Sequence, residues 1–386
     1  MINIVDQERC SGCYACINAC NHDAISMVKG EDWHIYPHVD LDRCIDCGEC
    51  DRSCPFLNEK IKHKVKPHSF AAYNKDYKER MQSTSGGIFP VFANYILNKG
   101  GKVCAARFDG NWNVIHDFVS SNEELLPFQK SKYIQSNIGL AYRDIKKMLF
   151  GGFPVLFVGL PCQVAGLKHY LKRDFDNLYT LELICMGIAS PYLWKEYLKV
   201  FESEKIKNIT FKDKAIGWYH SDWRMILEYY HKKPKVTRGR ENPFMYGYLD
   251  RMYYRPSCYK CIFKSPESCA DVTIGDAWGL ENYNPDFLDN KGTSTVIVNT
   301  EKGDRLVENV KDKMFITEFS YDKVIKSNKY LCKSVSRSKE YEQFYKILSK
   351  KGVKAAMNKC CKKKKSIARG PLKWVKSFLF GEFNRS

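Results

Sequence analysis

Eight of the seventeen cysteines stand in the first 54 residues, in two copies of one spacing. Each copy reads C-x2-C-x2-C-x3-C, and the copies comprise Cys10, Cys13, Cys16 and Cys20, then Cys44, Cys47, Cys50 and Cys54. This spacing is typical of thiolates that hold two [4Fe–4S] clusters, where the fourth cysteine of each run binds the other cluster. We therefore expect one cluster on Cys10, Cys13, Cys16 and Cys54, and the other on Cys20, Cys44, Cys47 and Cys50.

Structural zinc and disulfide bonds are the two other common uses of clustered cysteines. Zinc sites usually take two well separated C-x2-C pairs, whereas here the third and fourth cysteines follow at once. The opening residues MINIVDQERC show neither the basic nor the apolar stretch of an export signal. We therefore expect a cytoplasmic protein, in which disulfides are rare, and the spacing favours the two clusters.

An internal repeat indicates two related half-modules in this region. The pattern Val5-Asp6-x-x-Arg9-Cys10 recurs as Val39-Asp40-x-x-Arg43-Cys44. Residues 25–36 lie between the cysteine runs and read as a short hairpin. We interpret residues 1–57 as a bacterial-ferredoxin-like domain, which is too small to have much of a core and is held together by its clusters.

Composition divides the remainder of the chain. Its 386 residues suggest two or three domains. The polar segment 58–68 reads as a linker, residues 69–330 have a mixed α/β pattern, and residues 331–386 read as a helical and basic C-terminal tail. Residues 354–386 contribute nine of the net charge of +18. Because the charge gathers in a tail and no nucleic-acid motif occurs, we expect no nucleic-acid partner.

Strand and helix patterns alternate after residue 69. Apolar runs predict strands at residues 70–73, 103–108, 154–159, 178–184 and 295–299, and an antiparallel region at 209–211 and 224–230. Helical periodicity covers residues 86–97, 137–149, 163–171 and 303–310. This alternation predicts an α/β fold built on an open sheet, joined to the small α+β ferredoxin-like domain.

Four further cysteines follow strands or form a pair. Cys162 and Cys185 each follow an apolar strand, and Cys258 and Cys261 form C-x2-C. Loops at strand ends gather in such a sheet, so these four could hold a third [4Fe–4S] cluster. Cys269 is the rival ligand, and the alternative is that all are small buried core residues.

Residues from about 70 to 330 resemble the family of β subunits of deazaflavin-coenzyme hydrogenases and dehydrogenases, which includes a plant chlorophyll reductase. The motifs are SGG at 85–87, KYIQS at 132–136, GLPCQVAGLK at 159–168, CMGIASP at 185–191, the C-x2-C at Cys258, ADVTIGDAWG at 270–279, and GTSTVIVNT at 292–300 with Gly303. The departure is Ala277, where the family commonly has an aromatic residue.

The resemblance implies a flavin, most often FAD with FMN as the alternative, and at least one cluster in the main domain. It also assigns candidate flavin contacts, namely Ser85, Gly86, Gly87, Lys132, Gln135, Ser136, Thr293, Ser294 and Asn299. Lys132 or Arg255 near the flavin would stabilise a reduced, anionic ring.

These features together predict an iron–sulfur flavoprotein oxidoreductase, in which clusters pass electrons to a flavin that exchanges a hydride with a small-molecule substrate or deazaflavin coenzyme. The alternative is a non-catalytic electron-transfer subunit. Either would work with a redox partner, a ferredoxin or a dehydrogenase. The basic tail, with apolar residues beyond Pro371, could contact anionic membrane peripherally from the cytoplasmic side.

Overall fold

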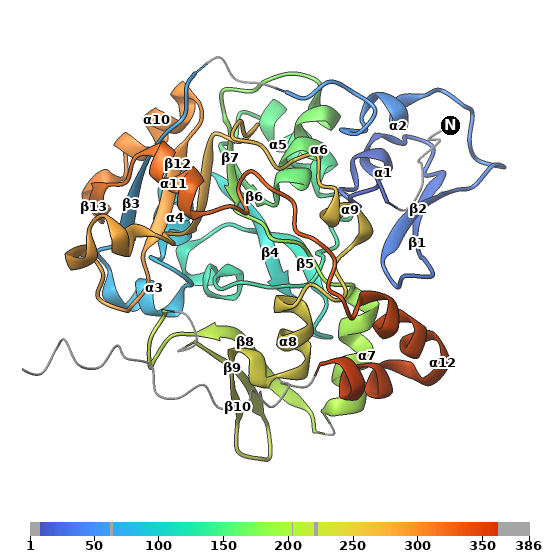
Figure 1. Ribbon diagram of the computed structural model, residues 1–386. Coiled ribbons are helices and arrows are strands. Elements are labelled where there is room, and N and C mark those ends of the chain that lie inside the picture. The colour runs from blue at the N-terminus through green and yellow to red at the C-terminus, as the bar shows by residue number, and fades with distance from the viewer. Residues whose placement is uncertain (1–7, 62–64, 203, 220–222, 362–386) are drawn as a thin grey trace, which may run out of the picture.

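The computed structural model describes residues 8–61, 65–202, 204–219 and 223–361 (Figure 1). The basic segment from Lys362 onward, on which the membrane prediction depends, lies outside these ranges. Within the described residues, no helix is both long and apolar enough to cross a bilayer.

The N-terminal module consists of two short helices and a hairpin. These elements are α1 (Ala15–Ala19), β1 (Ile25–Lys29), β2 (Ile35–Val39) and α2 (Glu49–Arg52). The hairpin is antiparallel, with Ile25 opposite Val39, as the sequence predicted. Each helix follows a residue with positive φ, Tyr14 at 68° and Gly48 at 72°, at equivalent places in the two repeats. The sequence repeat therefore corresponds to a repeat in the backbone.

An eight-stranded sheet forms the centre of the main domain. Its strand order is β13 (Met314–Glu318), β3 (His68–Asn74), β12 (Ser294–Val298), β11 (Val272–Asp276), β7 (Leu178–Leu183), β6 (Val155–Gly159), β4 (Lys102–Phe108) and β5 (Val114–Val119). The four inner strands from β11 to β4 are parallel, and the flanking strands pair antiparallel. The predicted α/β sheet is confirmed, with mixed strand directions.

Three strands of this sheet were not expected from the sequence. The strands β5 and β13 lie at the two edges, and polar residues interrupt their apolar runs, His116 and Asp117 in β5 and Thr317 and Glu318 in β13. The strand β11 reads VTIGD, and its glycine and polar residues hide a strand that lies between β7 and β12. These strands are defined by their neighbours more than by their own composition.

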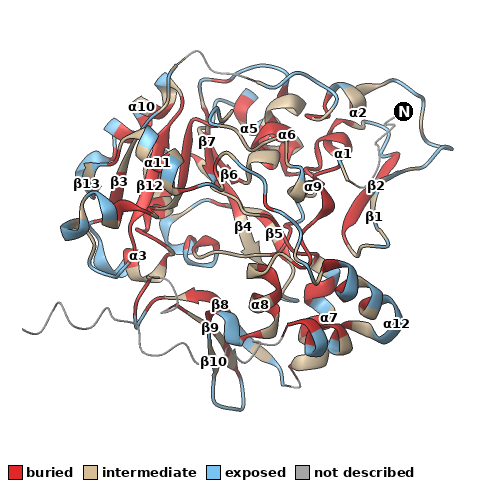
Figure 2. Cartoon of the chain, viewed as in Figure 1, coloured by how far each residue is buried: buried red, intermediate tan, exposed pale blue. Residues whose placement is uncertain are grey.

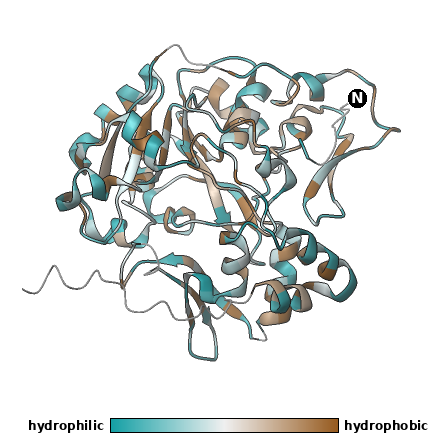
Figure 3. Cartoon of the chain, viewed as in Figure 1, coloured by the Kyte–Doolittle hydropathy of each residue, from teal (hydrophilic) through white to brown (hydrophobic). Residues whose placement is uncertain are grey.

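Helices cover both faces of the sheet. The helices α4 (Ile88–Asn98) and α10 (Glu301–Glu308) share one apolar cluster with the sheet, and α5 (Ala141–Phe150) and α6 (Pro161–Leu171) share another. Figure 2 shows the buried strands between partly exposed helices, and Figure 3 shows hydrophilic residues on the outer surfaces. The helix expected from residue 137 starts at Ala141, because Asn137 pairs with β5 and Gly139 takes a φ of 55°.

A smaller unit packs below the main sheet. It contains the antiparallel strands β8 (Ile206–Asp213), β9 (Arg224–Tyr229) and β10 (Lys235–Arg238), and the helices α7 (Pro191–Phe201), α8 (Pro243–Leu249) and α12 (Tyr341–Cys360). The expected region of antiparallel strands is thus present. Residues 341–361, expected in the tail, contribute Phe344, Met357 and Cys361 to this core. The short helices α3 (Tyr77–Gln82), α9 (Pro256–Tyr259) and α11 (Tyr321–Ser327) complete the fold.

Candidate cluster sites and cofactor cavity

The eight N-terminal cysteines line two separate small cavities. Both cavities have a volume of about 20 Å³. We call the cavity lined by Cys20, Cys44, Cys47 and Cys50 the distal site, and the cavity lined by Cys10, Cys13, Cys16 and Cys54 the proximal site. The structure therefore brings the cysteines together in the crossed sets that the spacing predicted, with the fourth cysteine of each run in the other site.

The four inner cysteines line a third cavity of about 30 Å³, which we call the inner site. Cys162 lies in the first turn of α6, Cys185 follows β7, Cys258 lies on α9, and Cys261 follows that helix. Cys269, the rival ligand, does not line this cavity and instead packs beside α5 and α6. The strand ends thus bring the expected set together.

Four cysteines line each of the three cavities, which is the number of thiolates that a [4Fe–4S] cluster takes. Among the described residues, no three His, Cys, Asp or Glu side chains are placed to bind one metal ion. In a [4Fe–4S] cluster each thiolate binds a different iron atom, so thiols around a cavity fit the cluster. Burial raises the pKa of the Cys13 and Cys258 thiols to about 12, which disfavours free thiolates there. Iron binding would compensate for this cost.

The three sites form a row that ends at a larger cavity. The distal and proximal sites share an apolar cluster that includes Cys16, Cys50 and Cys54. Ser11 and Phe56 line both the proximal and the inner site. The segment Cys185–Ile188 lines both the inner site and the large cavity. Because adjacent sites share these residues, the order along the chain of sites is the distal site, the proximal site, the inner site and the large cavity.

Close packing joins the N-terminal module to α6. A Cβ atom added at Gly166 would lie 3.0 Å from the Sγ atom of Cys13. The Tyr142 hydroxyl lies 2.9 Å from the carbonyl oxygen of Cys13 and 2.8 Å from that of Gln163. Arg143 donates to the carbonyl oxygens of Asn18 and Cys20. These contacts hold the proximal site against the main domain.

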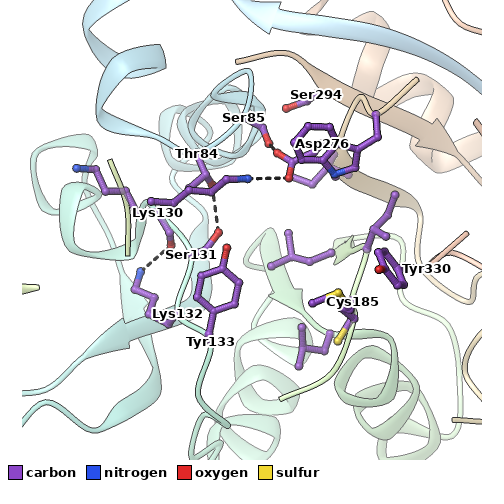
Figure 4. Close-up of a pocket in the computed structure, with 18 of the residues that line it drawn as sticks. Thr84, Ser85, Lys130, Ser131, Lys132, Tyr133, Cys185, Asp276, Ser294 and Tyr330 are labelled. Atoms are coloured by element: carbon purple, nitrogen blue, oxygen red, sulfur yellow. Dashed lines mark hydrogen bonds and ion pairs between the residues drawn. The ribbon is translucent and has the colours of Figure 1, made fainter. Parts of the chain in front are cut away.

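The large cavity has a volume of about 1430 Å³ and lies between the main sheet and the smaller unit. The carboxyl ends of β6, β7 and β11 open into it, as in open α/β sheets that bind ligands. In Figure 4, Ser85, Asp276 and Ser294 lie together at one end, and Cys185 and Tyr330 lie at another. The cavity therefore connects a polar cluster to the wall of the inner site.

Asp276 organises the polar end of the cavity. Its carboxylate accepts hydrogen bonds from the Ser85 hydroxyl, from the Lys212 Nζ atom at 2.8 Å and from the Trp218 indole nitrogen at 3.1 Å. Although burial opposes ionisation, Lys212 holds the pKa of the Asp276 carboxyl below its usual value. Trp218 stacks on Trp278 with ring centroids 4.8 Å apart. A buried ion pair beside an aromatic wall is thus fixed in place.

The segment 130–133 forms a second wall. The Lys132 Nζ atom donates to the backbone carbonyl oxygens of Pro127, Gln129 and Lys130. Burial, with a smaller effect from the neighbouring Lys130, lowers the pKa of Lys132 to about 7. Lys132 therefore belongs to the cavity wall, with its ammonium group held by three backbone carbonyl oxygens that anchor the segment.

Five of the nine expected flavin contacts line this cavity, namely Ser85, Gly87, Lys132, Ser136 and Ser294. Gly86 lies behind the wall, where an added Cβ atom would stand 2.4 Å from the carbonyl oxygen of Ala72. Thr293 is buried and is not a lining residue.

The remaining two expected contacts lie elsewhere. Asn299 follows the far end of β12 and donates to Thr273. Gln135 faces the N-terminal module and donates to the Gly12 carbonyl oxygen. Arg255, expected beside a flavin, also faces that module and does not line the cavity. Adjacent residues can thus face different surfaces, since Ser136 lines the cavity and Gln135 contacts the N-terminal module.

Sequence reasoning did not identify several residues of the cavity. Lys212 comes from the smaller unit, on β8, and nothing in its local sequence distinguishes it from a solvent-facing lysine. Arg238 and Tyr330 also line the cavity from distant segments. Asp276 belongs to the quoted motif at 270–279, and its place at the end of a strand was the available signal.

Two family models match separate parts of the chain. The family described as the C terminus of the coenzyme F420 hydrogenase/dehydrogenase beta subunit matches residues 154–324, and a 4Fe-4S dicluster domain matches residues 9–58. A coenzyme F420-dependent sulfite reductase of Methanocaldococcus jannaschii is 28% identical over 357 residues, which are 89% of this chain and 53% of that protein. The chain thus spans about half the length of that relative.

Two further relatives are similar to the chain. One subunit of the F(420)H(2) dehydrogenase of Methanosarcina mazei is 21% identical, over 82% of this chain and 86% of that protein. A chain of the F420-reducing [NiFe] hydrogenase complex of Methanosarcina barkeri is 15% identical, with a TM-score of 0.46, over 78% of this chain and 94% of that one. Residues 154–324 thus match the family of coenzyme F420 hydrogenase/dehydrogenase beta subunits, and a 4Fe-4S dicluster domain precedes this region in the chain.

Proposed function

We propose that this chain is an iron–sulfur flavoprotein oxidoreductase that relays electrons through three clusters to a flavin in the large cavity. The observation that carries the proposal is the segment Cys185–Ile188, which lines both the inner site and the cavity. An electron at the inner site would thus have only this short segment to cross.

The size and walls of the cavity support a flavin. A volume of about 1430 Å³ exceeds the range of about 300–1,000 Å³ that is usual for a single-ligand pocket. It therefore has space for a flavin, most often FAD in this family, with FMN as the alternative, and for an organic molecule beside it. A bound flavin would supply the conversion between single electrons and a hydride.

The chain's own residues would position this chemistry. Lys212 and Asp276 fix the polar end, and the Trp278 ring lies on the same wall. Lys132 lines the cavity, and its hydrogen bonds to three backbone carbonyl oxygens fix the shape of that wall. The hydroxyl groups of Ser131 and Ser136 also line the cavity and could donate to phosphate or ring oxygens, whereas the Ser85 hydroxyl donates to Asp276.

Relatives named for coenzyme F420, a deazaflavin, support a deazaflavin coenzyme as the hydride partner. The beta subunit of an F420-dependent formate dehydrogenase 1 of Methanococcus maripaludis is 25% identical over 58% of this chain and 54% of that protein. Because that relative is one subunit of a larger enzyme, it favours the second candidate, in which the chain serves a partner oxidoreductase and has no substrate of its own. The volume that the cavity would leave beside a bound flavin favours the first candidate, an oxidoreductase with a substrate of its own.

A redox partner, a ferredoxin or a dehydrogenase, would exchange electrons at the distal site. Cys47 there is exposed, and the adjacent Ile45 and Leu41 are 63% and 68% exposed. An exposed cluster edge with apolar residues beside it suits brief docking of another protein. Contact of the tail from Lys354 with anionic membrane remains a prediction. Co-sedimentation with anionic liposomes tests it on the full chain and on a chain ending at residue 361, which keeps the Met357 and Cys361 core contacts.

Flavin analysis of a cavity-filling variant tests the proposed function. Ser131 lines the cavity, and Ser120 is exposed outside it. We expect purified wild type and Ser120→Trp to release flavin on denaturation, and Ser131→Trp to release little while keeping its iron. Equal flavin in both variants would place the flavin elsewhere, and no flavin in the wild type would refute the flavoprotein.

A further inference from the structure

Arg255 is a fully buried arginine between the proximal and the inner site. Its side chain is 0% exposed. It precedes α9, the helix that carries Cys258, and its backbone carbonyl accepts a hydrogen bond from the Cys258 N–H at 2.9 Å. Its guanidinium group extends in the opposite direction, into the N-terminal module.

Four of the five N–H donors of this guanidinium meet an atom of the module or a residue that holds it. The Nε atom donates to the Cys10 carbonyl oxygen at 2.6 Å, and one terminal nitrogen donates to the Ile35 carbonyl oxygen at 2.8 Å. That same nitrogen lies 3.5 Å from the Sγ atom of Cys10. The other terminal nitrogen donates to Gln135 at 2.9 Å.

Nothing in the described part of the chain neutralises this charge by an ion pair. The described ion pairs include none with Arg255. The Tyr36 ring lies 4.3 Å from the guanidinium carbon, and the Asp32 carboxylate, which accepts from the Tyr36 hydroxyl, attracts the guanidinium less strongly than the Cys10 and Cys258 groups do. A buried charge that forms no ion pair is destabilising. The thiol groups of Cys10 and Cys258 become anionic when they bind iron, so the bound clusters would add negative charge beside the guanidinium.

We propose that Arg255 sets the reduction potential of the proximal cluster, by holding a permanent positive charge and a hydrogen-bond donor against the Cys10 sulfur atom. One electron entering the proximal cluster adds one negative charge there, and no bond forms or breaks. A fixed cation at this distance in a dry interior stabilises the added charge, and N–H···S hydrogen bonds act in the same direction. The inference rests on the relay proposed above, but only on its iron–sulfur part.

Two features of the sequence keep this arrangement close. Gly12 has a φ of 65°, and a Cβ atom there would lie 2.9 Å from an Arg255 nitrogen. Gln135 both accepts from Arg255 and donates to the Gly12 carbonyl oxygen at 3.1 Å. These contacts hold the cluster loop against the guanidinium, with its charge close to the Cys10 sulfur atom.

Redox titration followed by EPR tests the proposal on the cluster-loaded full chain. The proximal signal is assigned as the signal that Cys16→Ser loses. We expect Arg255→Met and Arg255→Gln to lower the equilibrium constant for reduction of this cluster at least about tenfold, or about 59 mV for one electron. Arg255→Lys keeps the charge and should retain most of the wild-type potential.

Arg143→Met is the matched control. Arg143 also ties the module to the main domain, but through carbonyl oxygens and Asp23 and with no hydrogen bond to sulfur. It should leave the proximal potential unchanged. An unchanged potential in Arg255→Met, an equal fall in Arg255→Lys or Arg143→Met, or loss of the cluster in all three Arg255 variants would overturn the proposal. Absence of flavin would leave this test intact, whereas absence of a Cys16-dependent signal in the wild type would refute the relay itself.

Discussion

Replacing Gly166 by alanine tests how closely the N-terminal module is docked on α6. A Cβ atom there would lie 3.0 Å from both the Cβ and the Sγ atom of Cys13. Carbon atoms pack best at about 3.5–4.0 Å, so the loop or the helix must retreat by roughly 0.5–1 Å. Overpacking of this kind costs about 1–3 kcal/mol.

The higher helix propensity of alanine opposes this cost, so the sign of the change in the free energy of unfolding shows which effect is larger. Alanine in place of glycine inside a helix normally recovers about 1 kcal/mol. The net expectation for Gly166→Ala is a destabilisation of roughly 0–2 kcal/mol, with a larger loss for Gly166→Val because it adds two more carbon atoms. Because Cys13 belongs to the proximal site, we also expect iron to be lost faster in air from both variants.

Thermal unfolding of the cluster-loaded chain, together with the rate of iron release, measures both effects. Gly110→Ala is the control, because an added Cβ atom at Gly110 meets nothing within 4 Å. If Gly166→Ala raises the melting temperature, as an unhindered helical position would, and releases iron at the wild-type rate, the close docking of Cys13 on α6 is refuted.

Two further predictions concern buried charges. Burial raises the pKa of Glu182 to about 7 from 4.5, so the folded state binds more protons than the unfolded state between these values and stability falls as pH rises through that window. Glu182→Gln should remove this loss, worth up to about 3 kcal/mol above pH 7, and an unchanged difference in melting temperature between pH 5 and pH 8 would contradict it. Asp276→Asn leaves the buried Lys212 without its carboxylate and should cost about 3–5 kcal/mol, by melting temperature, with loss of flavin. Adding Lys212→Met should recover most of that stability, and a double variant no more stable than Asp276→Asn would show that the ion pair is not the cause.

The sequence predicted the grouping of cysteines because cluster ligation imposes strict local spacing. The crossed exchange of Cys20 and Cys54 follows from a three-residue gap, and the structure has the same two sets. The inner set could be inferred because parallel strands end on one edge of a sheet. The role of these thiols as ligands remains a proposal that iron analysis can test.

The cavity contacts were less predictable because they depend on strand direction and on distant segments. Ser294 begins β12, and Asn299 follows the last residue of that strand. Because the two residues lie at opposite ends of the strand, only one of them reaches the cavity. Gln135 precedes the cavity residue Ser136 but faces the N-terminal module. Lys212 comes from the separate three-stranded sheet, and no local sequence pattern indicates how that sheet packs on the main domain.

The central claim is that a third cluster stands between the N-terminal module and the flavin cavity. Iron and acid-labile sulfide analysis of anaerobically reconstituted protein tests it most directly. We expect about twelve iron atoms per chain in the wild type, four for each of three clusters. The iron content should fall to about eight in the double variant Cys258→Ser, Cys261→Ser and stay near twelve in Cys269→Ser. About eight iron atoms in the wild type, unchanged in the double variant, would contradict the inner cluster and leave the proximal and distal clusters in place.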